Sequence, residues 1–104
     1  CYTASKHAVN GMIKSLATDY AKKPITFNSI CPAYVETPII DRNVDSIMAR
    51  TGMSKEQALQ MMVGVNPHGR LITPEEVAAA ALYICGPHSD SIRGQTVQVS
   101  GGEI

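Results

Sequence analysis

The apolar positions near the start of the chain recur with the spacing of an amphipathic α-helix. The repeating residues are Ala8, Val9, Met12, Ile13, Leu16, Ala17 and Tyr20. Charged side chains at positions 14, 19, 22 and 23 fall on the other face or at the end of this segment. The pattern predicts a helix over residues 2–21, which Pro24 would stop. Residues 25–31 are rich in β-branched and aromatic side chains and predict a strand, ended by Pro32.

Two helices are predicted in the middle of the chain from their end signals. Thr37 followed by Pro38 is typical of a helix start, and this helix should run to Gly52 as its C-terminal cap. Ser54 and Gln57 have the spacing of a capping box, which opens a further helix towards position 64. Its apolar residues are Met53, Leu59, Met61, Met62 and Val63. Because methionine adapts to irregular apolar shapes, two interpretations stand: a lid helix packed on the core, or a pocket wall for an acyl chain.

The clearest helix start lies at Thr73, where a threonine cap is followed by Pro74 and completed by Glu76. The helix should end at Gly86 and Pro87. Its expected buried stripe consists of Val77, Ala78, Ala81, Leu82, Ile84 and Cys85. A last strand is predicted over residues 96–100, where polar and apolar side chains alternate and the valines form one well-buried face.

The order of these elements predicts an α/β fold. Strands separated by helical crossovers form a parallel pair. Two strands are too few for a doubly wound sheet, whose parallel strands are covered on both faces. The chain also begins at Cys1 rather than at an initiator methionine. We therefore expect the C-terminal portion of a doubly wound parallel sheet, with the N-terminal portion absent.

Composition narrows the classes of partner. The chain of 104 residues is 44% hydrophobic and 17% charged, and its nine basic and nine acidic residues cancel. No basic stripe and no membrane-length apolar run is present, so neither nucleic acid nor a membrane is an expected partner. Cys1, Cys31 and Cys85 lack Cys-x-x-Cys spacing and indicate reduced thiols in a cytoplasmic protein. The histidines at positions 7, 68 and 88 lack metal-ligand spacing, so no metal site is predicted.

Tyr2 and Lys6 are the most informative pair of residues. Side chains four positions apart share one face of a helix. A phenol beside a fixed ammonium can act as a general acid and base near neutral pH. Alone, the same spacing also describes an ordinary solvated helix face. No nucleophile elbow surrounds Ser5, so acyl-enzyme chemistry is not predicted.

Three segments together resemble the short-chain dehydrogenase/reductase family. Residues 2–6, Tyr-Thr-Ala-Ser-Lys, are similar to its Tyr-x-x-x-Lys motif. Residues 28–38, Asn-Ser-Ile-Cys-Pro-Ala-Tyr-Val-Glu-Thr-Pro, are similar to its Asn-x-x-x-Pro-Gly-x-Val-x-Thr-Pro segment, with Ala33 in the position of the glycine. Residues 69–78 and the later pairs 94–95 and 101–102 resemble its C-terminal signature, with Ser100 where an aspartate is usual. The resemblance covers nearly the whole chain in the family's order.

The resemblance implies a single NAD(P)-binding Rossmann-type domain, of which residues 1–104 are the C-terminal part. About residues 38–66 would form the substrate lid. In this family the glycine-rich dinucleotide loop, the residue that selects NAD or NADP, and the catalytic serine and asparagine all precede the tyrosine. None of these segments is part of this sequence.

The resemblance also assigns the site. Tyr2 would exchange a proton with the substrate, and Lys6 would lower the pKa of the phenol and bind the nicotinamide ribose. Lowering a phenol pKa from about 10 to about 7 needs roughly 4 kcal/mol, which an ammonium about 4 Å away supplies at an effective dielectric of about 20. On an exposed helix such a pair contributes only about 0.2–0.5 kcal/mol, so a closed site is required. Val35 would hold the nicotinamide carboxamide through its backbone, with Thr37 nearby and Pro32 shaping the turn.

The implied function is that of an NAD(P)-dependent oxidoreductase, with NAD or NADP as cofactor. It would transfer a hydride between the nicotinamide and a secondary alcohol or ketone, with 3-hydroxyacyl or 3-oxoacyl compounds as candidate substrates. A homodimer or homotetramer is the expected assembly, and the chain alone is expected to be inactive. The alternative is a non-catalytic truncated chain that serves only as a subunit-interaction module.

Overall fold

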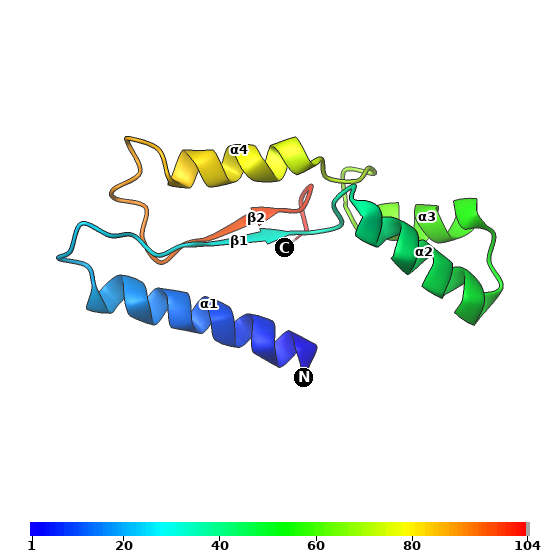
Figure 1. The fold of residues 1–104 in the computed structure, drawn as a ribbon, viewed down its shortest axis with the longest axis horizontal. Helices are drawn as coiled ribbons and strands as arrows, with labels where there is room; N and C mark the ends of the chain where they lie inside the picture. The colour runs from blue at the N-terminus through cyan, green and yellow to red at the C-terminus, as the bar shows by residue number, and fades with distance from the viewer. Residues whose placement is uncertain (104) are drawn as a thin grey trace. The chain divides into compact units, whose positions relative to one another are not determined.

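The computed structural model describes residues 1–103, and their helices and strands alternate as an α/β protein (Figure 1). The elements in order are α1 (Tyr2–Asp19), β1 (Ser29–Pro32), α2 (Pro38–Thr51), α3 (Lys55–Val63), α4 (Pro74–Ile84) and β2 (Thr96–Val99). The chain divides into two compact units. The first comprises Cys1–Cys31 with Ala79–Val97, and the second comprises Pro32–Ala78 with the chain from Gln98 onward.

β1 and β2 are neighbours in a two-stranded sheet (Figure 1). The backbone N–H of Ser29 donates to the carbonyl of Gln95 at 2.9 Å, and that of Ala33 donates to Val99 at 3.0 Å. Both strands advance by four residues between these bonds, so they run parallel. The predicted parallel pair with helical crossovers is therefore confirmed.

β1 is shorter and later than the predicted strand over residues 25–31, and Pro32 is its last residue rather than its terminator. Residues 21–25 are not paired with a strand. Instead, the Arg93 guanidinium donates hydrogen bonds to three of their backbone carbonyls. Pro32 is tolerated because the N–H groups of positions 29 and 33 face β2. The missing N–H of Pro32 falls on the opposite edge of the strand, so no bond to β2 is lost.

α2 and α3 pack against each other and form the hydrophobic core of the second unit (Figure 1). The buried side chains are Ile40, Val44, Ile47, Ala58 and Met62. Full burial of a large aliphatic side chain contributes about 1.5–3 kcal/mol, so this cluster is the main stabilising contact of the helix pair. Two end signals are confirmed: Gly52 caps α2 with φ 72°, and Ser54 with Gln57 forms the capping box of α3.

The predicted start of α4 is also confirmed. The N–H of Glu76 donates to the Thr73 hydroxyl at 3.2 Å, and the N–H of Thr73 donates to the Glu76 carboxylate at 3.3 Å. Arg70 donates to the same carboxylate, and this bond is the largest reason why the pKa of Glu76 lies below its ordinary value. The start of α4 is therefore fixed by local hydrogen bonds.

The predicted buried stripe of α4 is wrong. No residue of this helix is buried, and Leu82 and Tyr83 are 73% and 72% exposed. Adjacent strands lie about 5 Å apart, whereas a helix with its side chains is about 10 Å wide. Two strands are therefore too narrow to cover such a stripe. For the same reason Val97 and Val99 of β2 are half-buried rather than fully buried.

Among residues 1–103, no helix combines the length and the apolar character needed to cross a membrane.

Candidate functional site

α1 brings the two predicted catalytic side chains together. The Lys6 ammonium nitrogen lies 5.3 Å from the centre of the Tyr2 ring, as expected for residues one helical turn apart. Tyr2 is 75% exposed. A cation over an aromatic ring at an exposed position contributes only about 0.5–1 kcal/mol. The Tyr2 and Lys6 side chains are therefore close to each other, but the Tyr2 side chain is exposed to solvent.

Asn10 continues the polar face of Tyr2 and Lys6 by another four residues, and it ties α1 to β1. Its side-chain oxygen accepts a hydrogen bond from the Ser29 hydroxyl at 2.9 Å. The Ser29 hydroxyl also lies 3.2 Å from the hydroxyl of Thr96, the first residue of β2. This chain of polar groups joins the helix that carries the Tyr2–Lys6 pair to both strands. The four-residue spacing of Asn10 from Lys6 is visible in the sequence, but its contact with the strands is not.

The segment after β1 holds the backbone N–H and C=O of Val35 in a defined direction. Val35 pairs with Ile72 in a parallel bridge. The bridge is made by the neighbours of Val35: the N–H of Ile72 donates to Tyr34 at 2.9 Å, and the N–H of Glu36 donates to Ile72 at 2.8 Å. In such a ladder the bridging residue's own N–H and C=O point to the opposite side. The backbone groups of Val35 are therefore directed away from Ile72.

Thr37 precedes α2 at the predicted cap position, but its hydroxyl makes no capping hydrogen bond. A capping hydroxyl accepts from the N–H of the second or third helical residue. The third is Ile40, whose N–H donates to the Thr37 carbonyl at 2.9 Å instead. The hydroxyl is thus not required to cap the helix, and it stands at the N-terminus of a 14-residue helix, which favours negative charge.

The predicted site residues fall into two groups. Tyr2 and Lys6 lie together in the first unit. Pro32, Val35 and Thr37 lie within six residues of one another at the start of the second unit, where the chain leaves the carboxyl end of β1. Ligands of open α/β sheets bind beside the carboxyl ends of the strands.

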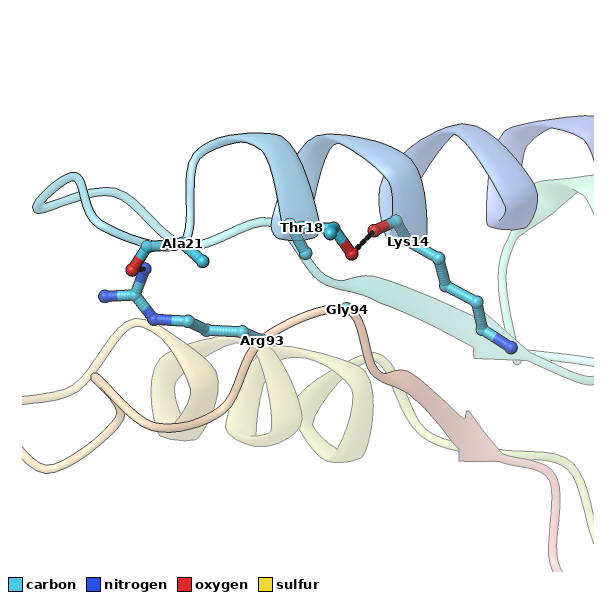
Figure 2. A pocket seen from close by; sticks show the side chains of 6 residues that line it. Lys14, Thr18, Ala21, Arg93 and Gly94 are labelled. Carbon is cyan, nitrogen blue, oxygen red and sulfur yellow. Dashed lines mark hydrogen bonds between the residues drawn. The ribbon is translucent and has the colours of Figure 1, made fainter.

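A hollow of roughly 370 Å³ lies in the first unit between α1 and the chain before β2, lined in part by Lys14, Ala17, Arg93 and Gly94 (Figure 2). Its two cations do not converge on one point. Figure 2 shows the Arg93 side chain extending towards Ala21, while Lys14 extends away from it. The Arg93 guanidinium is already bonded to backbone carbonyls and to Asp90. The arginine therefore acts as a structural tie rather than as an anion site.

Within residues 1–103, no group of three or more His, Cys, Asp or Glu side chains is arranged to hold a metal ion. Cys1, Cys31 and Cys85 are free thiols.

The described residues form an α/β fold with parallel strands, and similarity to known proteins identifies the family. The family model described as "Enoyl-(Acyl carrier protein) reductase" matches residues 1–103. A putative ketoacyl reductase of the monensin polyketide synthase of Streptomyces virginiae is 40% identical over 97% of the chain, and D-beta-hydroxybutyrate dehydrogenase of Rhizobium meliloti is 36% identical over 97%. A crystal structure of actinorhodin polyketide ketoreductase with NADPH matches 97% of the chain with 36% identity and a TM-score of 0.88.

The chain belongs to the short-chain dehydrogenase/reductase family, as its motifs predicted. It spans about 40% of the length of the relatives it matches: 40% of the hydroxybutyrate dehydrogenase, 39% of the monensin reductase and 39% of the actinorhodin ketoreductase.

Proposed function

We propose that this chain is the C-terminal part of a single NAD(P)-binding Rossmann-type domain in an oxidoreductase that uses NAD or NADP. The enzyme transfers a hydride between the nicotinamide and a secondary alcohol or ketone. The observation that carries the proposal is the Tyr2–Lys6 pair on α1, in a chain whose family contains dehydrogenases and reductases. The match to an NADPH-bound ketoreductase supports the cofactor.

Tyr2 moves the proton in this mechanism, and a bound nicotinamide would donate the hydride to a ketone or accept it from an alcohol. In the reducing direction the Tyr2 hydroxyl donates its proton to the carbonyl oxygen of the substrate. In the oxidising direction the phenolate oxygen accepts the proton of the alcohol. Lys6 stabilises the phenolate, because its ammonium is held one helical turn away on the same face. Since Tyr2 is 75% exposed, this stabilisation reaches catalytic strength only when the working site excludes water.

The segment from Pro32 to Thr37 fits a cofactor. The N–H and C=O of Val35 face away from Ile72, so both groups are free to pair with the nicotinamide carboxamide. The Thr37 hydroxyl is not used for capping and can donate to the carboxamide or to a phosphate. Pro32 ends β1 and fixes the direction in which the chain leaves the sheet.

The helix pair over about residues 38–66 is the proposed substrate lid. Its core is filled by its own side chains, which leaves Ile39 and Met61 exposed, at 57% and 45%. Exposed apolar side chains of this kind suit an acyl chain. A 3-oxoacyl or 3-hydroxyacyl compound is therefore the proposed substrate class, in line with relatives named as ketoacyl reductases and a hydroxybutyrate dehydrogenase. The proposed setting is the cytoplasm, and the proposed assembly is a homodimer or homotetramer.

The proposed function is tested by comparing Tyr2→Phe with Tyr83→Phe in the natural full-length protein. Both tyrosines are about equally exposed here, at 75% and 72%, and both changes remove only a hydroxyl. We expect ketone-dependent oxidation of NADH or NADPH to fall by a factor of about 10²–10⁴ in Tyr2→Phe, with cofactor binding retained. Tyr83→Phe should retain full activity. Full activity of Tyr2→Phe would rule out the proposed proton donor.

A non-catalytic interaction module is the second candidate. The observation in its favour is the exposure of Leu82 and Tyr83 on α4. Such a module would associate in solution, as measured by light scattering, without binding either nicotinamide cofactor. Cofactor binding by the purified protein would exclude it.

A further inference from the structure

Asn66 is a fully buried polar residue in the loop that follows α3. Only 1% of its surface is exposed. Its side-chain nitrogen donates to the carbonyls of Tyr34 at 3.0 Å and Arg70 at 2.8 Å. Its side-chain oxygen accepts from the backbone N–H of Tyr34 at 3.3 Å. The amide therefore pairs with backbone atoms of two segments, and buried polar groups are costly to leave without partners.

Both backbone groups of Tyr34 are held by this single side chain, and Tyr34 directly precedes Val35. The carbonyl of Tyr34 also accepts from the N–H of Ile72 in the parallel bridge. These bonds fix the peptide planes on the N-terminal side of Val35. The N–H of Val35 belongs to the same planar peptide unit as the Tyr34 carbonyl, so the bonds to that carbonyl fix its direction. The next unit, which carries the C=O of Val35, shares the Val35 Cα atom and is limited in turn.

The residues after Asn66 contact the chain beyond β2. A Cβ atom placed on Gly101 would collide with the His68 ring, and one on Gly102 would lie 3.6 Å from the Cβ of Pro67. Gly101 has φ 70°, a conformation that a residue with a Cβ seldom adopts. The loop of residues 66–68 thus packs against the segments that follow both strands, within the second unit.

We propose that Asn66 is a positioning residue of the cofactor site. It sets the direction of the Val35 backbone groups that pair with the nicotinamide carboxamide, without touching the cofactor itself. The amide is suited to this role because it offers two N–H donors and an acceptor, which match the groups facing it. An aspartate of the same shape would lack both donors and would place a negative charge against two carbonyl oxygens. This inference rests on the proposed function.

The test compares Asn66→Asp with Asn28→Asp in the natural full-length protein. Asn28 is a matched control: it also bonds two backbone groups, accepting from Gln95 and donating to Ile92, but it precedes β1 at the opposite end of the strand. The probe is NADPH or NADH, whichever binds the unchanged protein, titrated by nicotinamide fluorescence. Thermal unfolding of each variant is measured on the same samples. We expect Asn66→Asp to raise the Kd by about tenfold or more, and Asn28→Asp to leave it within about twofold at a comparable loss of Tm.

An unchanged Kd in Asn66→Asp would overturn the inference, and so would an equal rise in both variants, which would indicate general destabilisation. If Asn66→Asp does not fold, Asn66→Ser replaces it, because a hydroxyl can still donate to one of the two carbonyls. A Kd unchanged in Asn66→Ser would then overturn the inference, and a rise absent from Asn28→Asp would support it. Failure of the unchanged protein to bind either cofactor would instead overturn the proposed function.

Discussion

At the scale of single residues, the proposed acid–base pair of Tyr2 and Lys6 is brought together by α1, whereas the strength of its electrostatic interaction depends on the surrounding solvent. Tyr2 and Lys6 could be predicted from sequence because their contact spans one helical turn. Asn66 could not, since its partner Tyr34 lies 32 residues away in the chain. Asn10 could be predicted only in part. Its position on the helix face follows from the sequence, but its hydrogen-bond partner Ser29 lies 19 residues away in the chain. Local spacing thus predicts the pair for which a reaction is proposed, and only the fold shows the side chains that position distant segments.

Lys6→Met tests the electrostatic part of the mechanism. Methionine keeps much of the aliphatic length of lysine and removes the charge that is proposed to stabilise the Tyr2 phenolate. We expect kcat of the full-length protein to fall by about a hundredfold or more. Lys14→Met is the matched control, because Lys14 is an exposed lysine on the same helix. Equal activity of the two variants would show that the Lys6 charge plays no part.

At the scale of elements, end signals were predicted well and burial was not. The caps at Gly52, Ser54 and Thr73 depend on residues within a few positions, so the sequence contains the whole interaction. The limits of β1 depend on Arg93, which binds carbonyls about 70 residues away. The exposure of α4 depends on how wide a surface the sheet offers, and the periodicity of one helix carries no information about that surface.

The α2–α3 pair allows a test of packing with two adjacent methionines. Met62 is 2% exposed in the core of the pair, whereas Met61 is 45% exposed. Met62→Ala should lower the free energy of unfolding by about 2–5 kcal/mol, because it leaves a cavity among buried side chains. Met61→Ala should change it by no more than about 0.5 kcal/mol. Urea unfolding followed by circular dichroism measures both, and equal losses would contradict the assigned core.

At the scale of the whole molecule, the family is shown and the reaction is proposed. The first unit holds the Tyr2–Lys6 pair, for which we propose proton transfer, and the second unit by itself holds the Val35 backbone groups, for which we propose nicotinamide binding. The chain spans about 40% of the length of its relatives, whose remaining segments lie outside this sequence. Because Tyr2 is exposed to water, we expect that these residues alone do not turn over a ketone.

The most direct measurement is isotope transfer by the natural full-length protein. NADH or NADPH carrying deuterium on both faces of the reacting nicotinamide carbon is incubated with a 3-oxoacyl thioester, and the product is analysed by mass spectrometry. The proposed function predicts one deuterium on the new carbinol carbon, with the hydroxyl proton coming from solvent through Tyr2. Unconsumed cofactor and ketone, or an alcohol without the label, would contradict hydride transfer by this protein.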